Sequence, residues 1–280
     1  MSEPKAPEPD NLSRATGLRE ALAKDGIHVW TVRTEGPDEV VEGFTRVLST
    51  DENERAGRFR FDHLRRSYVL SRGALRFLAG AYMRIPPAAI AFRYGSKGKP
   101  SLDSPEGVDF NVSHSEALAV FAFAAECEIG VDVEQIRPIA EMQTIASRYF
   151  CTEEAAELMS LAELERPRAF FLCWTRKEAY LKAVGDGLSA PLDAFRVSLI
   201  PGEPARFLHI GGDSNVAREW VLHDLQLAEN YAAAVAYRGP RRRLAVFPLV
   251  EPADLLRDPS GLMNRFALAM RGERVAGTQE

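Results

Sequence analysis

The sequence has few cysteines and no long apolar run, and both absences limit what the protein can be. No uninterrupted apolar stretch reaches the length of about 18 residues that a membrane-spanning helix needs, so we expect no membrane segment. The three cysteines, Cys127, Cys151 and Cys173, fit neither a disulfide framework nor a metal-ligand spacing. Apolar neighbours surround each of them, so we expect buried thiols and a reducing, cytoplasmic location.

Two common catalytic signatures are also missing. No Gly-x-Ser-x-Gly motif surrounds Ser113, which argues against a hydrolase triad. The loop 95–100 contains glycine and lysine but lacks the spacing of a Walker phosphate loop.

The net charge of −5 argues against general nucleic-acid binding over the whole surface.

Helical and strand patterns alternate irregularly along the chain, which is typical of an α+β protein. A hydrophobic fraction of 46% and a charged fraction of 27% are ordinary for a globular protein of 280 residues. We expect a loose, proline-rich leader over 1–25, an N-terminal α+β half over 26–126, a C-terminal half over 127–250 and a peripheral tail over 251–280.

The first chemical motif is an expected strand with two acids. The apolar residues at odd positions of 129–133 would face the core, whereas Asp132 and Glu134 would share the other side with Gly130. Carboxylates two residues apart on one face lie about 7 Å apart at the backbone and can converge on one Mg²⁺. We expect the glycine to leave room for a ligand. The alternative is an edge strand with a solvated acidic face.

A later helix carries the second motif. Over 167–184, Trp174, Glu178 and Lys182 recur every four residues and therefore share one side. A surface salt bridge between Glu178 and Lys182 is the alternative to a functional role. Lys177 falls near the centre of the apolar stripe, where we expect a buried stem and an amine that reaches solvent.

Potential phosphate-binding donors form two further groups. Asn111, Ser113 and His114 lie close together at the end of an expected strand, where a simple turn is the alternative. The segment 54–76 has seven arginines against two acids, and Lys97 and Lys99 follow in a loop. Arginine suits phosphates and carboxylates alike, so this basic segment would serve a nucleotide or an acidic partner. Some of its charges would simply cover a solvated helix face.

Together these motifs resemble the larger, surfactin-type class of 4′-phosphopantetheinyl transferases. The matching segments are Gly98-Lys99-Pro100, Phe110-Asn111-Val112-Ser113-His114-Ser115, Ile129-Gly130-Val131-Asp132-Val133-Glu134, and Trp174-x-x-Lys177-Glu178-Ala179-Tyr180-x-Lys182. The resemblance implies a pseudo-dimer of two similar α+β halves with coenzyme A in the cleft between them. It also implies transfer of the 4′-phosphopantetheine arm to a serine of an acyl or peptidyl carrier protein, with release of 3′,5′-ADP.

The same resemblance implies roles for individual residues. Asp132, Glu134 and Glu178 would bind Mg²⁺, and the metal site would lie in the C-terminal half. Glu178 would also be the general base, directly or through a water, while Lys182 and His114 would stabilise charge on the phosphates. The implied coenzyme A contacts are Arg55, Arg66, Lys97, Lys99, Pro100, Ser113, His114 and Lys182.

The expected partners are coenzyme A and a carrier protein, with no nucleic acid and no membrane, and the chain would act as a monomer. Fatty-acid, polyketide and peptide-synthetase carriers all remain open. One alternative function is a non-catalytic protein that binds coenzyme A or a carrier. Another is a magnesium-dependent phosphotransferase that acts on free nucleotides.

Overall fold

The computed structural model describes residues 16–22, 26–95, 98–102, 107–185 and 191–271. Helices and strands are both abundant, which confirms the predicted α+β class, while the pseudo-dimer of two similar halves stays a prediction. Contacts divide the chain into two compact units. The first combines described residues of 1–26, 32–91 and 249–280, and the second combines those of 27–31 and 92–248.

The first unit is helical. Its elements are α1 (Thr16–Leu22), α2 (Asp38–Thr45), α3 (Thr50–Gly57), α4 (Asp62–Met83), the 3₁₀ turn η2 (Pro87–Ala89), α9 (Pro252–Arg257) and α10 (Pro259–Arg271). Helix α3 begins with a capping box, in which the Ser49 amide donates to Glu52 at 3.0 Å. Glu52 also accepts a hydrogen bond from the buried guanidinium of Arg76 at 2.6 Å, which ties α3 to α4.

The C-terminal helices correct one expectation. Residues 251–280 were predicted to form a peripheral tail, yet Leu255 and Met263 are fully buried. Helices α9 and α10 contact α1, α2 and α4, so they complete the core of the first unit. Because the segment contains many charged residues, its sequence did not indicate the apolar face that makes these contacts.

The second unit contains nearly all the strands. They are β1 (Gly26–Arg33), β2 (Phe92–Tyr94), β3 (Pro100–Leu102), β4 (Val108–Ser115), β5 (Leu118–Ala125), β6 (Ile129–Gln135), β7 (Phe195–Val197), β8 (Phe207–Ile210), β9 (Trp220–Asp224), β10 (Tyr231–Arg238) and β11 (Arg243–Val246). One sheet has the order β11-β1-β5-β4 and another the order β6-β10-β9, while β2-β3 and β7-β8 form two-stranded ribbons. Strand β4 also contacts β6, so 92–126 joins the residues that follow it, whereas the sequence suggested a division near 127.

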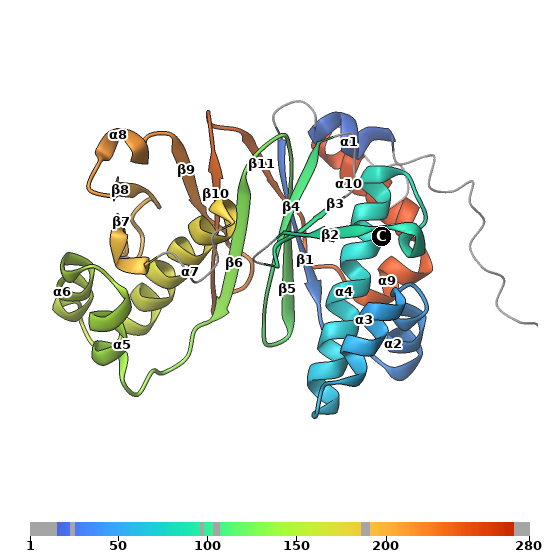
Figure 1. Ribbon diagram of the computed structural model, residues 1–280, viewed down its shortest axis with the longest axis horizontal. Helices are drawn as coiled ribbons and strands as arrows, with labels where there is room; N and C mark the ends of the chain where they lie inside the picture. The colour runs from blue at the N-terminus through green and yellow to red at the C-terminus, as the bar shows by residue number, and fades with distance from the viewer. Residues whose placement is uncertain (1–15, 23–25, 96–97, 103–106, 186–190, 272–280) are drawn as a thin grey trace, which may run out of the picture. The chain divides into compact units, whose positions relative to one another are not determined.

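The helices of the second unit are α5 (Met142–Tyr149), α6 (Thr152–Ser160), α7 (Arg166–Val184), the 3₁₀ turn η4 (Leu192–Ala194) and α8 (Ser214–Ala217). Helix α7 lies across β6 and β10, with α5 and α6 nearby (Figure 1). The side of β10 that faces α7 carries the small residues Ala232, Ala234 and Ala236. Their small size lets the helix approach the sheet closely.

The strand alternation predicted for 129–134 is confirmed. Ile129, Val131 and Val133 belong to a core cluster on one face of β6. Asp132 pairs in register with Ala234 of β10 and so lies on the α7 side. Cys127, Cys151 and Cys173 are buried free thiols, as expected. None of the helices in the described part of the chain combines the length and apolar character that a bilayer crossing requires.

Candidate active site

Gly130 sets the distance between β6 and α7. A Cβ placed on this residue would lie 2.0 Å from the carbonyl oxygen of Ala179 and 2.4 Å from the amide nitrogen of Ala183. The predicted space at this glycine is therefore filled by the backbone of α7, and the expectation that it leaves room for a ligand was wrong. The close approach brings the α7 side chains Glu178 and Lys182 next to the acids of β6.

Asp132, Lys182 and Ser113 form the centre of the site. The Lys182 ammonium donates to Asp132 Oδ1 at 2.6 Å and to Ser113 Oγ at 2.9 Å. The Ser113 hydroxyl donates to the same Asp132 oxygen at 2.8 Å. Strand β6, helix α7 and strand β4 thus each supply one polar group. Asp132 is almost fully buried, whereas the Lys182 side chain is 28% exposed and can reach a ligand from solvent.

Glu134 lies two residues further along the same face. Its Oε2 accepts a hydrogen bond from the Ser115 hydroxyl at 3.0 Å and lies 3.7 Å from the Arg137 guanidinium. Burial raises the pKa of Glu134 above its usual value, and the negative charge of Asp132 adds to this shift. The carboxylate is half-buried, so it remains open to a ligand.

Glu178 contributes a third carboxylate from α7. Trp174, Glu178 and Lys182 are each half-buried, and their four-residue spacing within α7 places them on one side of the helix. Burial raises the pKa of Glu178, and the nearby charge of Asp132 raises it further. Its Oε1 atom is buried without a hydrogen-bond partner, and so is Oδ2 of Asp132.

These two uncommitted oxygens bear on the predicted metal site. As the side chains stand, no group of three or more histidine, cysteine, aspartate or glutamate residues among those described is gathered closely enough to hold a metal ion. In place of a metal ion, the Lys182 ammonium donates a hydrogen bond to Asp132. Buried carboxylate oxygens normally have a partner, and oxygen is the donor that Mg²⁺ prefers. The donor set therefore fits a hard cation, although the three acids have not closed around one point.

Among the expected coenzyme A contacts, Ser113 lies in this cluster and His114 does not. His114 is exposed, and strand alternation directs it to the face of β4 opposite Ser113. Lys99 donates to the carbonyls of Ala183 at 2.9 Å and Ile129 at 3.3 Å, and burial lowers its pKa. Pro100 begins β3 next to it, and Lys97 lies outside the described residues.

Two further expected contacts belong to the helical unit. The Arg55 guanidinium lies over the ring of Tyr68, 5.5 Å from its centroid. Arg66 pairs with Asp38 and donates to the carbonyl of Gly36 at 2.6 Å. Both arginines thus have partners within their own unit, and the grouping with Ser113 and Lys182 stays a prediction.

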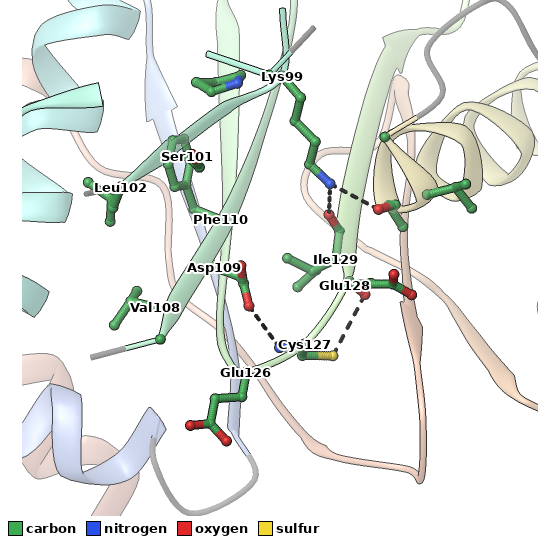
Figure 2. Close-up of a pocket in the computed structure, with 16 residues that line it drawn as sticks. Lys99, Ser101, Leu102, Val108, Asp109, Phe110, Glu126, Cys127, Glu128 and Ile129 are labelled. Carbon is green, nitrogen blue, oxygen red and sulfur yellow. Dashed lines mark hydrogen bonds between the residues drawn. The ribbon is translucent and has the colours of Figure 1, made fainter. Parts of the chain in front are cut away.

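A cavity of about 660 Å³ lies further along β6 and α7. Figure 2 shows Lys99 reaching into it from above, and Asp109 bonded to the backbone of Cys127 at 2.8 Å. Its lining includes the acids Asp109, Glu126 and Glu128 but neither Lys182 nor the carboxylates described above. The lining also includes Lys99 and Pro100, which are two of the expected coenzyme A contacts.

Comparison with known proteins agrees with this chemistry. A family model described as the 4′-phosphopantetheinyl transferase superfamily matches residues 128–236, and one described as 4′-phosphopantetheinyl transferase, N-terminal, matches residues 37–127. The 4′-phosphopantetheinyl transferase HetI of Nostoc sp. is 37% identical over 236 residues, which cover 83% of this chain and 93% of that protein. The chain belongs to the 4′-phosphopantetheinyl transferase superfamily. It is therefore an enzyme of the transferase class, as the sequence predicted.

Other relatives of the superfamily are more distant. The 4′-phosphopantetheinyl transferase Sfp of Bacillus subtilis is 30% identical over 56% of this chain and 69% of its own length. The human L-aminoadipate-semialdehyde dehydrogenase-phosphopantetheinyl transferase is 28% identical over 70% of this chain and 68% of its own length. The matches to both family models and to HetI extend well beyond the site motifs, so the likeness concerns most of the fold.

One residue in the superfamily's helix motif has a role that differs from the expectation. Lys177 is fully buried, and its amine does not reach solvent. It pairs with the buried Glu154 at 2.8 Å and donates to the carbonyls of Leu192 at 2.8 Å and Phe195 at 2.5 Å. The partner carboxylate lies on α6, and sequence spacing offered no sign of it. Lys177 therefore connects α7 to α6, to η4 and to the first residue of β7.

Sequence reasoning grouped Asn111 with Ser113 and His114 as donors, but it missed that Asn111 and Ser115 contact strand β6. The amide of Val131 donates to Asn111 Oδ1 at 2.9 Å, and Ser115 contacts Glu134 as described above. The available signal was the alternation of Asn111, Ser113 and Ser115, which places three polar side chains on one face of a strand.

Proposed function

We propose that this chain transfers the 4′-phosphopantetheine arm of coenzyme A to a serine hydroxyl of an acyl or peptidyl carrier protein. The observation that carries the proposal is the cluster of Lys182, Asp132 and Ser113 beside Glu178, with two buried carboxylate oxygens left uncommitted. Such a site offers both a cation for phosphate oxygens and acids for proton transfer. Its occurrence in a member of this superfamily favours phosphopantetheine as the group transferred.

We assign Mg²⁺ to Asp132, Glu134 and Glu178. The support is chemical, because each is a carboxylate and two of them hold a buried oxygen without a hydrogen bond. Bound there, Mg²⁺ would offset the negative charge of the diphosphate. In a metal-free protein, three neighbouring acids repel one another, and Lys182 is the cation that offsets part of this charge.

Lys182 would bind the diphosphate directly. An ammonium has three donors, and two of them are used by Asp132 and Ser113. The third can point to a phosphate oxygen without the loss of either contact. Because the amine is held at two points before the substrate arrives, little reorganisation is needed when charge develops on the phosphate.

Glu178 would act as the general base. It would take the proton from the carrier serine while the serine oxygen bonds to the pantetheine-side phosphorus. The bond from that phosphorus to the bridging diphosphate oxygen breaks, and 3′,5′-ADP leaves with the electron pair. Because the buried Oε1 of Glu178 is assigned to the cation, the second oxygen of this carboxylate would accept the proton.

The remaining substrate contacts rest on the resemblance of the sequence motifs to the superfamily. Lys97, Lys99, Pro100, Ser113 and His114 are assigned to coenzyme A, together with Arg55 and Arg66 of the basic segment 54–76. An acidic carrier surface would also complement that segment. We propose that the chain works as a monomer in the cytoplasm, without nucleic-acid or membrane partners.

Intact-mass measurement of a carrier protein tests this function. The chain is mixed with coenzyme A, Mg²⁺ and an apo carrier, and the carrier should gain the mass of one phosphopantetheine arm. Asp132→Asn and Glu178→Gln should abolish the gain while the far-ultraviolet circular dichroism stays that of the parent. If fatty-acid, polyketide and peptide-synthetase carriers all stay unmodified while coenzyme A binds, the chain is a non-catalytic binder. Normal turnover by both variants would contradict the metal assignment.

A further inference from the structure

Strand β6 is bridged on one edge by side chains instead of backbone. It forms a backbone ladder with β10 and lies at the end of its sheet. On the other edge, three amides of β6 donate to side chains of β4 that lie 20 residues earlier in the sequence. These contacts are Val131 N to Asn111 Oδ1 at 2.9 Å, Val133 N to Ser113 Oγ at 3.4 Å, and Gln135 N to Ser115 Oγ at 3.1 Å.

Two of the three bridging side chains also hold an acid. The Ser113 hydroxyl donates to Asp132 at 2.8 Å, and the Ser115 hydroxyl donates to Glu134 at 3.0 Å. A serine hydroxyl has one proton to donate and lone pairs to accept with. Each serine therefore accepts from one β6 amide and donates to the carboxylate one residue before that amide. Asn111 accepts from an amide in the same way but contacts no carboxylate.

We propose that Ser115 is a positioning residue that orients Glu134 for the cation. Its hydroxyl engages Oε2, and in the part of the chain that the structure describes no hydrogen bond engages Oε1 of the same carboxylate. The second neighbour of Oε2, Arg137, is 3.7 Å away and 53% exposed, so it restrains the carboxylate weakly. Among the residues that the structure describes, Ser115 thus makes the one short contact that sets the direction of Oε1.

The backbone contact of Ser115 strengthens this role. Because the hydroxyl also accepts from the Gln135 amide, its proton is directed to Glu134 and cannot rotate freely. Groups that orient a metal ligand in this way typically change metal affinity by about 10- to 100-fold when they are removed. This inference rests on the proposed function, because it assumes that Glu134 binds a divalent cation.

The direct test is Mn²⁺ binding, measured by the electron paramagnetic resonance signal of free Mn²⁺ with coenzyme A present and no carrier. Ser115→Ala should weaken Mn²⁺ binding by about tenfold. At saturating metal its kcat should stay within about twofold of the parent, because the metal is then restored to its place. Ser115→Thr keeps the hydroxyl and should recover most of the Mn²⁺ affinity.

Asn111→Ala is the matched control for a purely structural role. It removes the same kind of bridge to β6 without touching an acid, so it should lower the melting temperature and leave Mn²⁺ affinity within about twofold. Equal Mn²⁺ affinity in Ser115→Ala and the parent would overturn the inference. So would an equal loss of affinity in Asn111→Ala.

The test also separates this inference from the proposed function. If the parent protein binds Mn²⁺ but modifies no carrier, the transfer function fails and the role of Ser115 can still be read from the affinities. If the parent binds no Mn²⁺, both the cation assignment and the role of Ser115 are overturned.

Discussion

The carbonyl oxygen of Ala179 occupies the space where a side chain at Gly130 would begin, 2.0 Å from an ideal Cβ. This contact joins the middle of α7 to the start of β6. Glu178 and Lys182 flank the contact on α7, and Asp132 lies two residues beyond Gly130 on β6. Because Gly130 has no Cβ, α7 can approach β6 closely enough to bring the three groups proposed for catalysis together.

Gly130→Ala should lower both stability and activity. The new Cβ would force α7 away from β6, and such overpacking costs about 1–3 kcal/mol of unfolding free energy. Transfer should fall by more than about tenfold because Lys182 and Glu178 move with the helix. Urea unfolding and carrier modification measure the two effects. Gly57→Ala is the control, since nothing lies within 4 Å of its added Cβ, and a similar loss in that variant would contradict the explanation.

Lys182→Ala should damage catalysis more than folding. The side chain is 28% exposed, so its removal leaves no buried cavity, but Asp132 loses its one charged partner among the described residues. We expect kcat/KM for coenzyme A to fall about 100-fold, the effect typical of a lost donor to a developing anion. Steady-state kinetics measure this. Arg257→Ala, which breaks only an exposed ion pair, should leave kcat/KM unchanged. An unchanged kcat/KM in Lys182→Ala would remove the residue from the site.

Lys177→Met, in contrast to Lys182→Ala, should damage folding stability more than catalysis. It leaves the buried carboxylate of Glu154 without its counter-ion, and a broken buried pair costs about 3–5 kcal/mol of unfolding free energy. The variant tests whether this lysine of the motif is structural, through the midpoint of urea unfolding. Arg168→Met, at an exposed position of the same helix, should change stability by less than about 0.5 kcal/mol. Equal stability of Lys177→Met and the parent would show that the pair contributes nothing.

His28 should make the protein acid-sensitive. Burial, together with the smaller effect of the positive charge of Arg243, lowers its pKa from 6.5 to about 4. The folded protein therefore binds fewer protons than the unfolded chain between these values, so the contribution is complete above pH 6.5 and is lost as the pH falls towards 4. The loss should reach about 3 kcal/mol.

Chemical denaturation at several pH values checks the His28 prediction. His28→Gln should flatten the fall in stability between pH 6.5 and 4, because glutamine does not titrate. His63→Gln changes an exposed histidine and should leave the slope as in the parent. If His28→Gln keeps the parental slope, other groups govern the acid response.

How much of the site could be predicted depended on whether its residues lie on the same element. The alternation at 129–134 correctly placed Asp132 and Glu134 on one face, because strand geometry is local. The spacing of Glu178 and Lys182 was informative for the same reason. The partner of Lys177 and the occupant of the space at Gly130 come from other elements, and no local pattern encodes them. The α+β class was likewise readable from local patterns, whereas the division into units depends on long-range contacts.

The helical unit takes its core from both ends of the chain, since α9 and α10 pack with α1, α2 and α4. During translation, the chain must emerge from the ribosome at least as far as α9 and α10 before Leu255 and Met263 can be buried. The other unit is continuous from 92 to 248 apart from the short segment 27–31, and its residues have all emerged before those of α10. The helical unit should therefore complete its folding after the other unit, which leaves α4 exposed to chaperones until α10 has emerged.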